Sequence, residues 1–564
     1  MNFTGRCPAR IVAISGLVSL FFGMAHGTPQ PSSVPQNGSD EVRAFRISGT
    51  VVSATTGAPL AQARVSLAET KNRENVASLV TNDSGHFEFS QLKAGKFSLT
   101  GAKRGYISSN YEQHEQYSTA IVTGPGYAPE NLVLRLTPMA FISGQVFDEA
   151  EEPIRDAQVI IFREDHNAGM TRINRLSASV TDDRGYYDFA QLRPANYFLS
   201  VTAKPWYAIH PPDAYGIANA SASQVSPGLD VAYPTTYYNG SSDSDSATPI
   251  EVKAGDHLRI DLHLNPVPAL HLLVHVGEGE TIGALLRKFP QLQQRVFDSV
   301  DYQRIDFPHL VAPGVYELTG IPAGRYTVRI ENPNTGEFEQ SNEVDLIRNG
   351  QSLNDSRGEP VGSLNLSLKM SGDEPLPKQY SVSLLKSARR SVAMQQGDSS
   401  GQVSFQDLAP GKYAIYVTNS TMPPVSVERT TSPAGDSLGH DVTVSPGTAV
   451  DLTAYLSAGM VDIEGVVQIK DESVAGVMVA LVPKDAEAHT ELFRRDQSDF
   501  DGTFILRGVI PGSYTVVAVQ NAWGFDWQKP SVLQQFIKHG QSVNIDGKTR
   551  GTLHLPRPVE VQQR

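Results

Sequence analysis

The sequence predicts an all-β protein, a tandem array of about five antiparallel β-sandwich domains. One observation is a recurring phrase: a turn that closes on glycine, an alternating aromatic strand, a second turn and another strand. A second is its period, because the turn glycines Gly85 and Gly185 lie 100 residues apart, the length of a small domain. A third is the regular spacing of short strands and turn signals, which is typical of β-sandwiches.

The recurring phrase has a local physical cause. A glycine after Asp-rich residues supplies the positive φ of a tight turn, as in 81–85 and 181–185. Phe87 and Phe89 then alternate onto one face of a strand, which we expect to be the core. Looser copies of the phrase begin at Gly314, Gly401 and Gly502.

A strand pair with a turn precedes each clear copy, and the combined pattern resembles a known family. Ile47 to Val52 reads Ile-Ser-Gly-x-Val-Val, and an Ala-x-Val strand follows a Gly57 to Pro59 turn. With the Thr-Asx-Asp-x-Gly turn, this resembles carboxypeptidase regulatory-like domains, also described as transthyretin-like (prealbumin-like) or Cna B-type sandwiches. The resemblance implies an Ig-like sandwich fold and mostly non-catalytic modules, often in tandem in exported bacterial proteins.

The pattern divides the chain into seven segments. The resemblance is strongest for 46–136 and 141–264 and weakest for 267–358. A small helical insertion is expected in the third sandwich at 281–300, because apolar residues there recur at helical spacing around Pro290. The predicted segments are a signal peptide at 1–27, a disordered linker at 28–45, and sandwiches at 46–138, 139–266, 267–360, 361–458 and 459–564.

The first 27 residues predict export. Arg6 and Arg10 form a basic start, an apolar run extends from Ile11 to Met24, and small residues follow. A short buried N-terminal helix is the alternative, but the run lacks an amphipathic pattern. The only cysteine, Cys7, precedes the apolar run, so we expect neither a lipid anchor nor a disulfide in the mature chain. The expected location is the periplasm, the cell surface or the extracellular space.

Composition limits the partners. The formal net charge of −13 is spread along 564 residues without a basic block, which argues against nucleic acid. No second apolar run of about 20 residues is present, so no transmembrane segment is expected. The expected partner is an envelope protein or a polysaccharide.

Long loops after the second-turn strands are unusually aromatic. The loop at 203–248 is the longest, and the corresponding loops of the first and fifth sandwiches are aromatic too. Exposed rings could stack on sugar rings or contact a protein partner. The alternative is that they pack back over the sandwich as a satellite core. The candidate ligand-binding residues are Trp206, Tyr207, Tyr233, Tyr237, Tyr238, Tyr106, Tyr111, Trp523 and Trp527.

Catalytic signatures are weak. His275 and Glu278 have the His-x-x-Glu spacing of metallocarboxypeptidase zinc ligands, but a third ligand and a catalytic carboxylate are not evident. Alternation along 270–276 would place His271 and His275 on one face of a strand. We therefore predict no catalytic residue, no metal site and no cofactor.

Three classes of function remain open. The first is an exported, non-catalytic scaffold or interaction protein, and it requires no chemistry that the sequence lacks. The second is an array of carbohydrate-binding modules that uses the aromatic loops. The third, a metallocarboxypeptidase-related enzyme, is disfavoured by the missing ligands.

Overall fold

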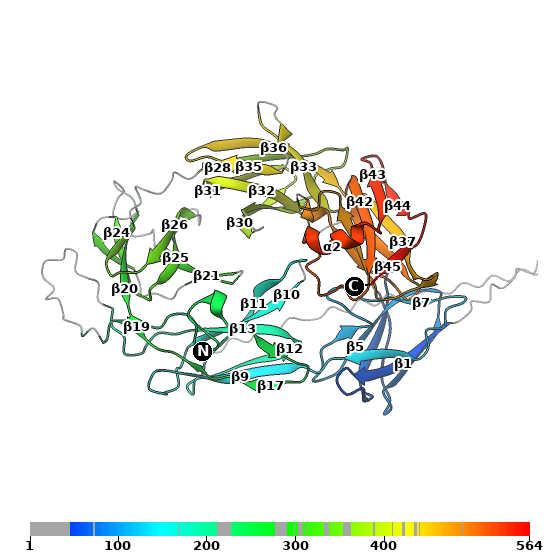
Figure 1. The fold of residues 1–564 in the computed structure, drawn as a ribbon, viewed down its shortest axis with the longest axis horizontal. Coiled ribbons are helices and arrows are strands. Elements are labelled where there is room, and N and C mark those ends of the chain that lie inside the picture. Colours follow the sequence, from blue (N-terminus) through cyan, green and yellow to red (C-terminus); the bar gives the residue numbers. More distant parts are fainter. Residues whose placement is uncertain are drawn as a thin grey trace, which may run out of the picture. The chain divides into compact units, whose positions relative to one another are not determined.

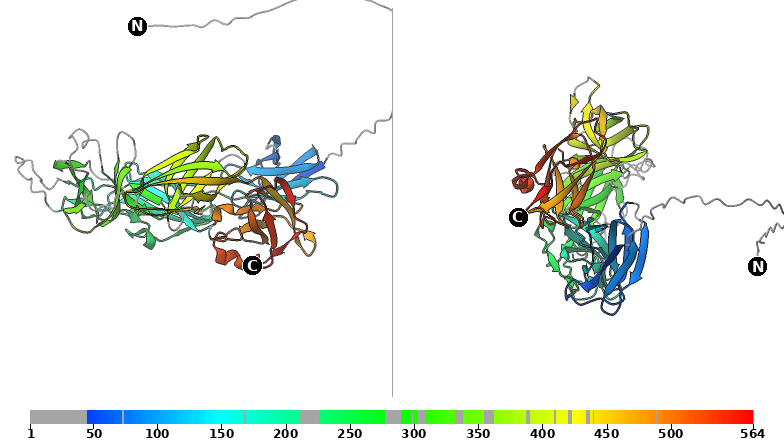
Figure 2. Two further views of the ribbon diagram at one scale, coloured as in Figure 1. Left: turned by 90° about the horizontal axis from the view of Figure 1, so that it is seen from above. Right: turned by 90° about the vertical axis from the view of Figure 1, so that its right-hand side faces the viewer.

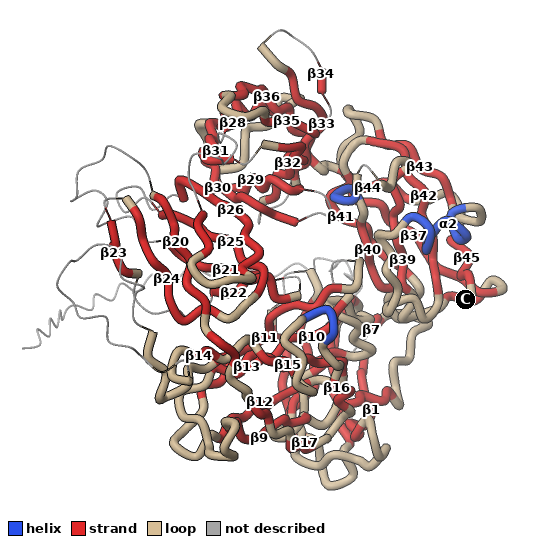
Figure 3. Tube along the Cα trace, turned by 60° about the vertical axis from the view of Figure 1, so that its left-hand side comes forward, coloured by secondary structure: helices blue, strands red, loops and turns tan. Residues whose placement is uncertain are grey.

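Strands dominate the structure, which is a computed structural model (Figure 1). It describes residues 45–563 with gaps at 72–73, 167–168, 211–225, 227, 277–289, 298, 303–307, 313, 332–337, 354–361, 387–389, 409, 420–422, 434–436, 439 and 488. The predicted leader and linker lie outside the described residues. The all-β prediction is confirmed, and strands fill most of the described trace in Figure 3.

The first two sandwiches have the same plan. The first contains β1 (Phe45–Ser53), β2 (Arg64–Glu69), β3 (Asn75–Val80), β4 (His86–Leu92), β5 (Gly95–Ala102), β6 (Ser109–Asn110), β7 (Ile121–Thr123) and β8 (Leu132–Leu136). The second contains β9 (Ala140–Phe147), β10 (Gln158–Asp165), β11 (Arg172–Val180), β12 (Tyr186–Leu192), β13 (Ala195–Thr202), β14 (Val231–Ala232), β15 (Thr236–Tyr237), the 3-10 turn η1 (Ser244–Ser246), β16 (Ile250–Val252), β17 (His257–Arg259) and β18 (Leu262–His263).

The third and fourth sandwiches follow in the chain. The third contains β19 (Val267–Pro268), β20 (Leu270–His275), β21 (Pro290–Val296), β22 (Ser299–Tyr302), β23 (His309–Ala312), β24 (Val315–Ile321), β25 (Gly324–Glu331), β26 (Phe338–Leu346) and β27 (Gln351–Leu353). The fourth contains β28 (Gly362–Met370), β29 (Gln379–Lys386), β30 (Arg390–Asp398), β31 (Gln402–Leu408), β32 (Gly411–Thr418), β33 (Val425–Thr431), β34 (Ser437–Leu438), β35 (Asp441–Val444) and β36 (Ala449–Ala458).

The fifth sandwich adds short helices to the strands. It contains β37 (Val461–Ile469), β38 (Glu472–Ser473), β39 (Met478–Pro483), the 3-10 turn η4 (Thr490–Leu492), β40 (Arg494–Gln497), β41 (Thr503–Val509), β42 (Gly512–Val519), α2 (Pro530–Ile537), β43 (Gln541–Ile545), β44 (Gly551–His554) and β45 (Val559–Gln562). No helix in the described part of the chain is long and apolar enough to cross a membrane.

Each sandwich has its own buried core. In the first, the sheets β4-β1-β8 and β3-β2-β5-β6 face each other, and Phe87 and Phe89 lie between them. The other four sandwiches each have a separate cluster of buried aliphatic and aromatic residues. Figure 2 shows the layered sheets from two further directions. The alternating aromatic strand therefore serves the core, as the sequence predicts.

The first and last strands of a sandwich pair in parallel, and a glycine makes this possible. β9 pairs with β17 and β18 in parallel, and Gly144 lies in β9 against the segment between them. A Cβ at Gly144 would lie 1.6 Å from the carbonyl oxygen of Ile260, and one at Gly49 would lie 2.2 Å from that of Leu132. The glycine of the Ile-Ser-Gly phrase is thus required by the close approach of the last strand.

The helical insertion predicted at 281–300 is wrong over its described part. Residues 281–289 lie outside the described residues, and Pro290–Val296 is strand β21, which pairs with β25 and β22. The apolar residues divide between two clusters: Leu292 enters the core of the third sandwich, and Val296 and Phe297 pack against the second sandwich. In the described part, the apolar residues that suggested one helix face therefore pack against two different sandwiches.

The close approach at Gly144 yields a prediction. Gly144→Ala should destabilise the second sandwich by at least about 3 kcal/mol, because the backbone carbonyl of Ile260 cannot move aside as a flexible side chain would. Urea unfolding, with hydrogen exchange of the second sandwich's amides as the probe, measures the loss of stability. The control is Gly547→Ala, where nothing lies within 4 Å of the added Cβ and little change is expected. Equal effects of the two substitutions would contradict this explanation.

Candidate functional site

The predicted aromatic residues fall into three structural situations. Tyr233, Tyr237 and Trp527 are buried, and Tyr238 packs against the core of the second sandwich. Tyr106 and Tyr111 are half-buried against the core of the first. Trp523 is half-buried at a contact between the first and fifth sandwiches, which Trp527 also lines. These rings therefore form cores and an internal contact, and Trp206, which is 83% exposed, is the exception.

Arg495 is the centre of the contact between the first and fifth sandwiches. Its side chain is only 2% exposed, and its Nη2 lies 2.6 Å from Oε2 of Glu115. The guanidinium lies 4.2 Å from the ring centre of Trp527, with the rings of Tyr117 and Trp523 at 5.3 and 5.8 Å. A buried cation that is both paired and placed over aromatic faces is strongly held. We call these five residues the Arg495 clasp.

Polar groups surround the clasp and extend the contact. The His114 ring stacks on Trp523 with centroids 5.0 Å apart and planes 8° from parallel. Gln497, beside Arg495 on β40, donates from Nε2 to the carbonyl of Glu112 at 2.7 Å and to Thr119 Oγ1 at 2.8 Å. The sequence predicts no functional role for Arg495, Glu115 or His114. No local pattern distinguishes these residues from ordinary surface polar residues.

The backbone takes part in the same contact. The amide of Phe500 donates to the carbonyl of Ala120 at 3.0 Å, and the amide of Ala120 donates to Oδ1 of Asp499 at 3.0 Å. The segment after His114 therefore covers the edge strand β40 and its following turn. Edge strands expose unpaired backbone groups, so this cover also protects the fifth sandwich.

Acidic groups beside the clasp are held away from water. Burial raises the pKa of Asp499, although Lys96 opposes the effect from 2.6 Å. Burial also raises the pKa of Asp496 to about 6, against hydrogen bonds from the amides of Ile505 and Gln497. At neutral pH the surroundings of Asp496 therefore disfavour the ionised form of its carboxyl.

The second sandwich contacts the fifth as well. Oδ1 of Asp526 accepts from the Thr171 amide at 2.6 Å and from its hydroxyl at 2.8 Å, and His166 Nδ1 lies 3.2 Å away. Burial opposes ionisation of Asp526, but the hydrogen bonds from Lys529, Thr171 and His166 outweigh it and lower the pKa of the carboxyl. The fifth sandwich is thus joined to both the first and the second.

Trp206 of the second sandwich packs against Tyr207, whose position is fixed by a hydrogen bond to Glu149. Its ring meets that of Tyr207 edge to face, with centroids 5.8 Å apart. The hydroxyls of Tyr207 and Tyr233 both donate to the Glu149 carboxylate, the second at 2.7 Å. Burial tends to raise the pKa of Glu149, but the two phenol hydrogen bonds lower it overall. An exposed indole therefore lies next to a rigid tyrosine whose partner is an ionised carboxylate.

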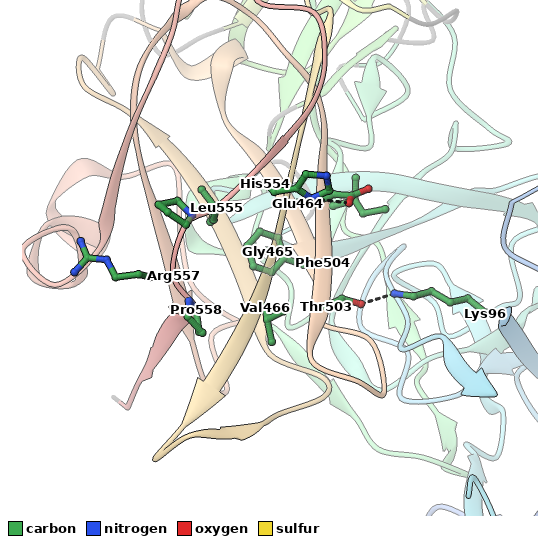
Figure 4. Close-up of a pocket in the computed structure, with 12 residues that line it drawn as sticks. Lys96, Glu464, Gly465, Val466, Thr503, Phe504, His554, Leu555, Arg557 and Pro558 are labelled. Atoms are coloured by element: carbon green, nitrogen blue, oxygen red, sulfur yellow. Dashed lines mark hydrogen bonds and ion pairs between the residues drawn. The ribbon is translucent and has the colours of Figure 1, made fainter. Parts of the chain in front are cut away.

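A pocket of about 400 Å³ opens in the fifth sandwich (Figure 4). β44 and β45 both pair with β37, but the segment that connects them, which includes Pro556 and Pro558, does not pair with β37 at Gly465. The pocket lies at this break in the pairing. Phe504 and Leu555 occupy the space that the last strand fills in the first two sandwiches. His554 at the rim pairs with Glu464 at 3.3 Å, and Lys96 reaches Thr503. Apolar residues such as Val466 and Phe504 line the pocket together with the charged side chains of Lys96, Glu464 and Arg557.

The His275 and Glu278 pair suggested by the zinc spacing falls only partly within the described residues. No group of three metal-ligating side chains occurs among the residues that the structure describes. His275 lies near Ser352 Oγ at 3.3 Å, and Glu278 is outside the described residues. Leu272 and Val274 of β20 pack in the core of the third sandwich, so alternation places His271 and His275 together on the other face, where His271 is buried and His275 stays partly exposed.

Comparisons with known proteins agree with this architecture. Residues 46–135 match the carboxypeptidase regulatory-like domain family. Residues 459–544 match the family described as BOS complex subunit NOMO1-like, second beta sandwich domain. No curated relative matches the chain. The chain is therefore a tandem β-sandwich protein that carries a carboxypeptidase regulatory-like domain.

Several solved structures show some similarity to the chain. The TIE protein of Bacillus anthracis is 13% identical over 75% of this chain and 76% of that chain, with a TM-score of 0.16. The major pilin subunit BcpA of Bacillus cereus is 12% identical over 73% of this chain and 99% of its own, with a TM-score of 0.14. The minor pilin GBS52 of Streptococcus agalactiae is 12% identical over 40% and 97%, with a TM-score of 0.20.

The Arg495 clasp predicts that removing the charge of Glu115 strongly lowers the stability of the contact between the first and fifth sandwiches. Glu115→Gln should destabilise the contact by about 3 kcal/mol, because it leaves the buried guanidinium without its opposite charge. The control is Glu88→Gln, which breaks the exposed pair with Arg46 and should cost less than about 1 kcal/mol. Urea unfolding of the full chain, with Trp fluorescence as the probe, compares the two variants. Similar losses in both would show that the clasp is not a buried ion pair.

The raised pKa of Asp496 predicts a pH-dependent gain. In the folded chain its pKa is about 6, above the ordinary value of about 3.9, so folding is favoured by protonation and stability is lost as pH rises through about 6. Asp496→Asn should therefore stabilise the protein by about 3 kcal/mol at pH 7.5 and by little at pH 4. Urea unfolding at both pH values measures this difference. A gain that is equal at the two pH values, or a loss at pH 7.5, would contradict the assignment.

Proposed function

We propose that this protein is an exported, non-catalytic scaffold of the cell envelope or extracellular space that binds a protein partner. The observation that carries the proposal is the Arg495 clasp. Trp523 and Trp527 of the fifth sandwich lie at this contact, where Trp523 stacks on His114 and Trp527 faces Arg495. A chain built this way offers a fixed arrangement of loops rather than a set of independent binding modules.

Two further observations support this proposal. The first 27 residues have the charge and hydropathy pattern of a secretory leader. The carboxypeptidase regulatory-like match concerns a type of domain that mostly accompanies other activities without catalysing a reaction. The exposed Trp206 supplies the contact residue, since a large aromatic ring on a rigid base is a typical centre of a protein interface.

A carbohydrate-binding function is the second candidate, and Trp206 is also the residue that favours it. An open indole face can stack on a sugar ring. With the other candidate rings buried or half-buried, such a site would bind weakly. A fluorescence titration with soluble polysaccharides distinguishes the candidates, because Trp206 is the exposed tryptophan of the three in the sequence.

The scaffold proposal is tested by photo-crosslinking in the native cell. A photoreactive residue at position 206 of the full chain should capture an envelope protein, whereas one at the exposed Tyr127 should not. N-terminal sequencing of this protein, isolated from the crosslinked complex, should show a mature N-terminus near Thr28. Retention in the cytoplasm with Met1 intact would contradict export. Equal capture at both positions would contradict the role of Trp206, and saturable polysaccharide binding lost in Trp206→Ala would favour the carbohydrate function instead.

A further inference from the structure

Four titratable side chains form a chain of contacts between the second and third sandwiches. His271 on β20 places Nδ1 2.7 Å from Oε1 of Glu317 on β24. Its Nε2 lies 3.3 Å from Oδ2 of Asp230, which belongs to the second sandwich just before β14. Oδ1 of Asp230 in turn lies 2.9 Å from Nδ1 of His210, in the loop after β13. We call these four residues the His271 network.

The network is buried at its centre. The side chains of His271 and Glu317 are 2% and 1% exposed, and that of Asp230 is 25% exposed. His210 packs closely against Gly320 at the end of β24. Water therefore cannot compensate for a misplaced charge at His271 or Glu317, and the protein groups must do so themselves.

Proton counting shows what state of His271 the geometry favours. A neutral imidazole has one N–H and one lone pair, and an ionised carboxylate only accepts. With His271 neutral, one of its nitrogens would direct a lone pair at a carboxylate oxygen, and that contact would be repulsive. The imidazolium has a proton on each nitrogen, so it can face Glu317 and Asp230 together.

We propose that the His271 network is a pH-sensitive latch between the second and third sandwiches, closed while His271 is protonated and loosened when it loses that proton. The charged groups that face His271 are Glu317 from its own sandwich and Asp230, backed by His210, from the second. The amide of His271 also donates to Oδ1 of Asn349, which fixes the backbone beside the ring.

The direction of the effect follows from which state binds the proton. Protonation favours the closed latch, so the contact is strongest below the ordinary imidazole value of about 6.5 and weakens as pH rises above it. The contact should therefore be tightest in mildly acidic solution.

Other contacts between the same two sandwiches do not titrate. Phe297 packs against Phe162, Phe198 and Tyr237 with ring centroids 4.9 to 5.4 Å apart. β14 pairs with β19, and the Ala269 amide donates to the carbonyl of Asp230 at 3.0 Å. Loss of the proton should thus loosen the segment around His271 without separating the sandwiches.

Hydrogen exchange of the full chain tests the latch. The hydrogen-exchange rates of the β20 amides, corrected for the intrinsic effect of pH, should rise about tenfold between about pH 6 and pH 9. A tenfold change corresponds to a pKa of His271 that differs by about one unit between the closed and the loosened states. Glu317→Gln should abolish the rise, because a glutamine amide can donate to Nδ1 while neutral His271 donates from Nε2 to Asp230. The control is Asp345→Asn in the same sandwich, whose exposed pair with Arg325 should leave the rise intact.

A second measurement keeps the test independent of the variants. The ring nitrogens of His271, observed by nitrogen NMR of the wild type, should show imidazolium near pH 6 and lose a proton over the pH range in which exchange rises. Exchange that stays flat in the wild type, a rise that persists in Glu317→Gln, or a His271 ring that is neutral near pH 6 would each overturn the latch.

Discussion

A buried guanidinium needs an opposite charge, and this constraint ties the first sandwich to the fifth. Arg495 is almost fully buried at the contact, and the carboxylate that neutralises it comes from Glu115 in the first sandwich. Taking a charge out of water is costly unless pairing and hydrogen bonds compensate for it. The two sandwiches must therefore meet in a single register, with the edge of β40 covered by the segment that carries Glu115. The aromatic rings around Arg495 depend on the same register.

Inside each sandwich a different constraint operates, and it is local. The last strand of the first two sandwiches approaches the first so closely that only a glycine fits, at Gly49 and Gly144. The turn glycines Gly85 and Gly185 have φ values of 72° and 70°, which other residues rarely adopt. In the fifth sandwich the last strand moves away at Gly465, and the pocket beside Phe504 is the result.

These local constraints explain why the fold was largely predictable from the sequence and the candidate site was not. Glycine turns and the alternation of Phe87 and Phe89 depend on residues that are close together in the sequence. Their pattern can therefore be recognised in a single copy, and its repetition strengthens the prediction. Arg495, which serves a contact between sandwiches, has its partner Glu115 380 residues away in the sequence. The same reason misled the interpretation of 290–297, where Leu292 and Phe297 belong to different cores. The sequence marks the aromatic loops as unusual, but whether each ring is buried or exposed depends on packing that the loop sequence does not encode locally.

The central claim, that the first and fifth sandwiches form one fixed contact, is tested most directly by native-state hydrogen exchange of two amides. Ala120 donates to Asp499, and Phe500 donates to Ala120, so each amide is held by the opposite sandwich. The structure predicts that both amides exchange slowly and that low urea releases them together, before the cores of the two sandwiches open. Exchange of either amide at the rate of an exposed loop, or release of the two at different urea concentrations, would contradict the contact.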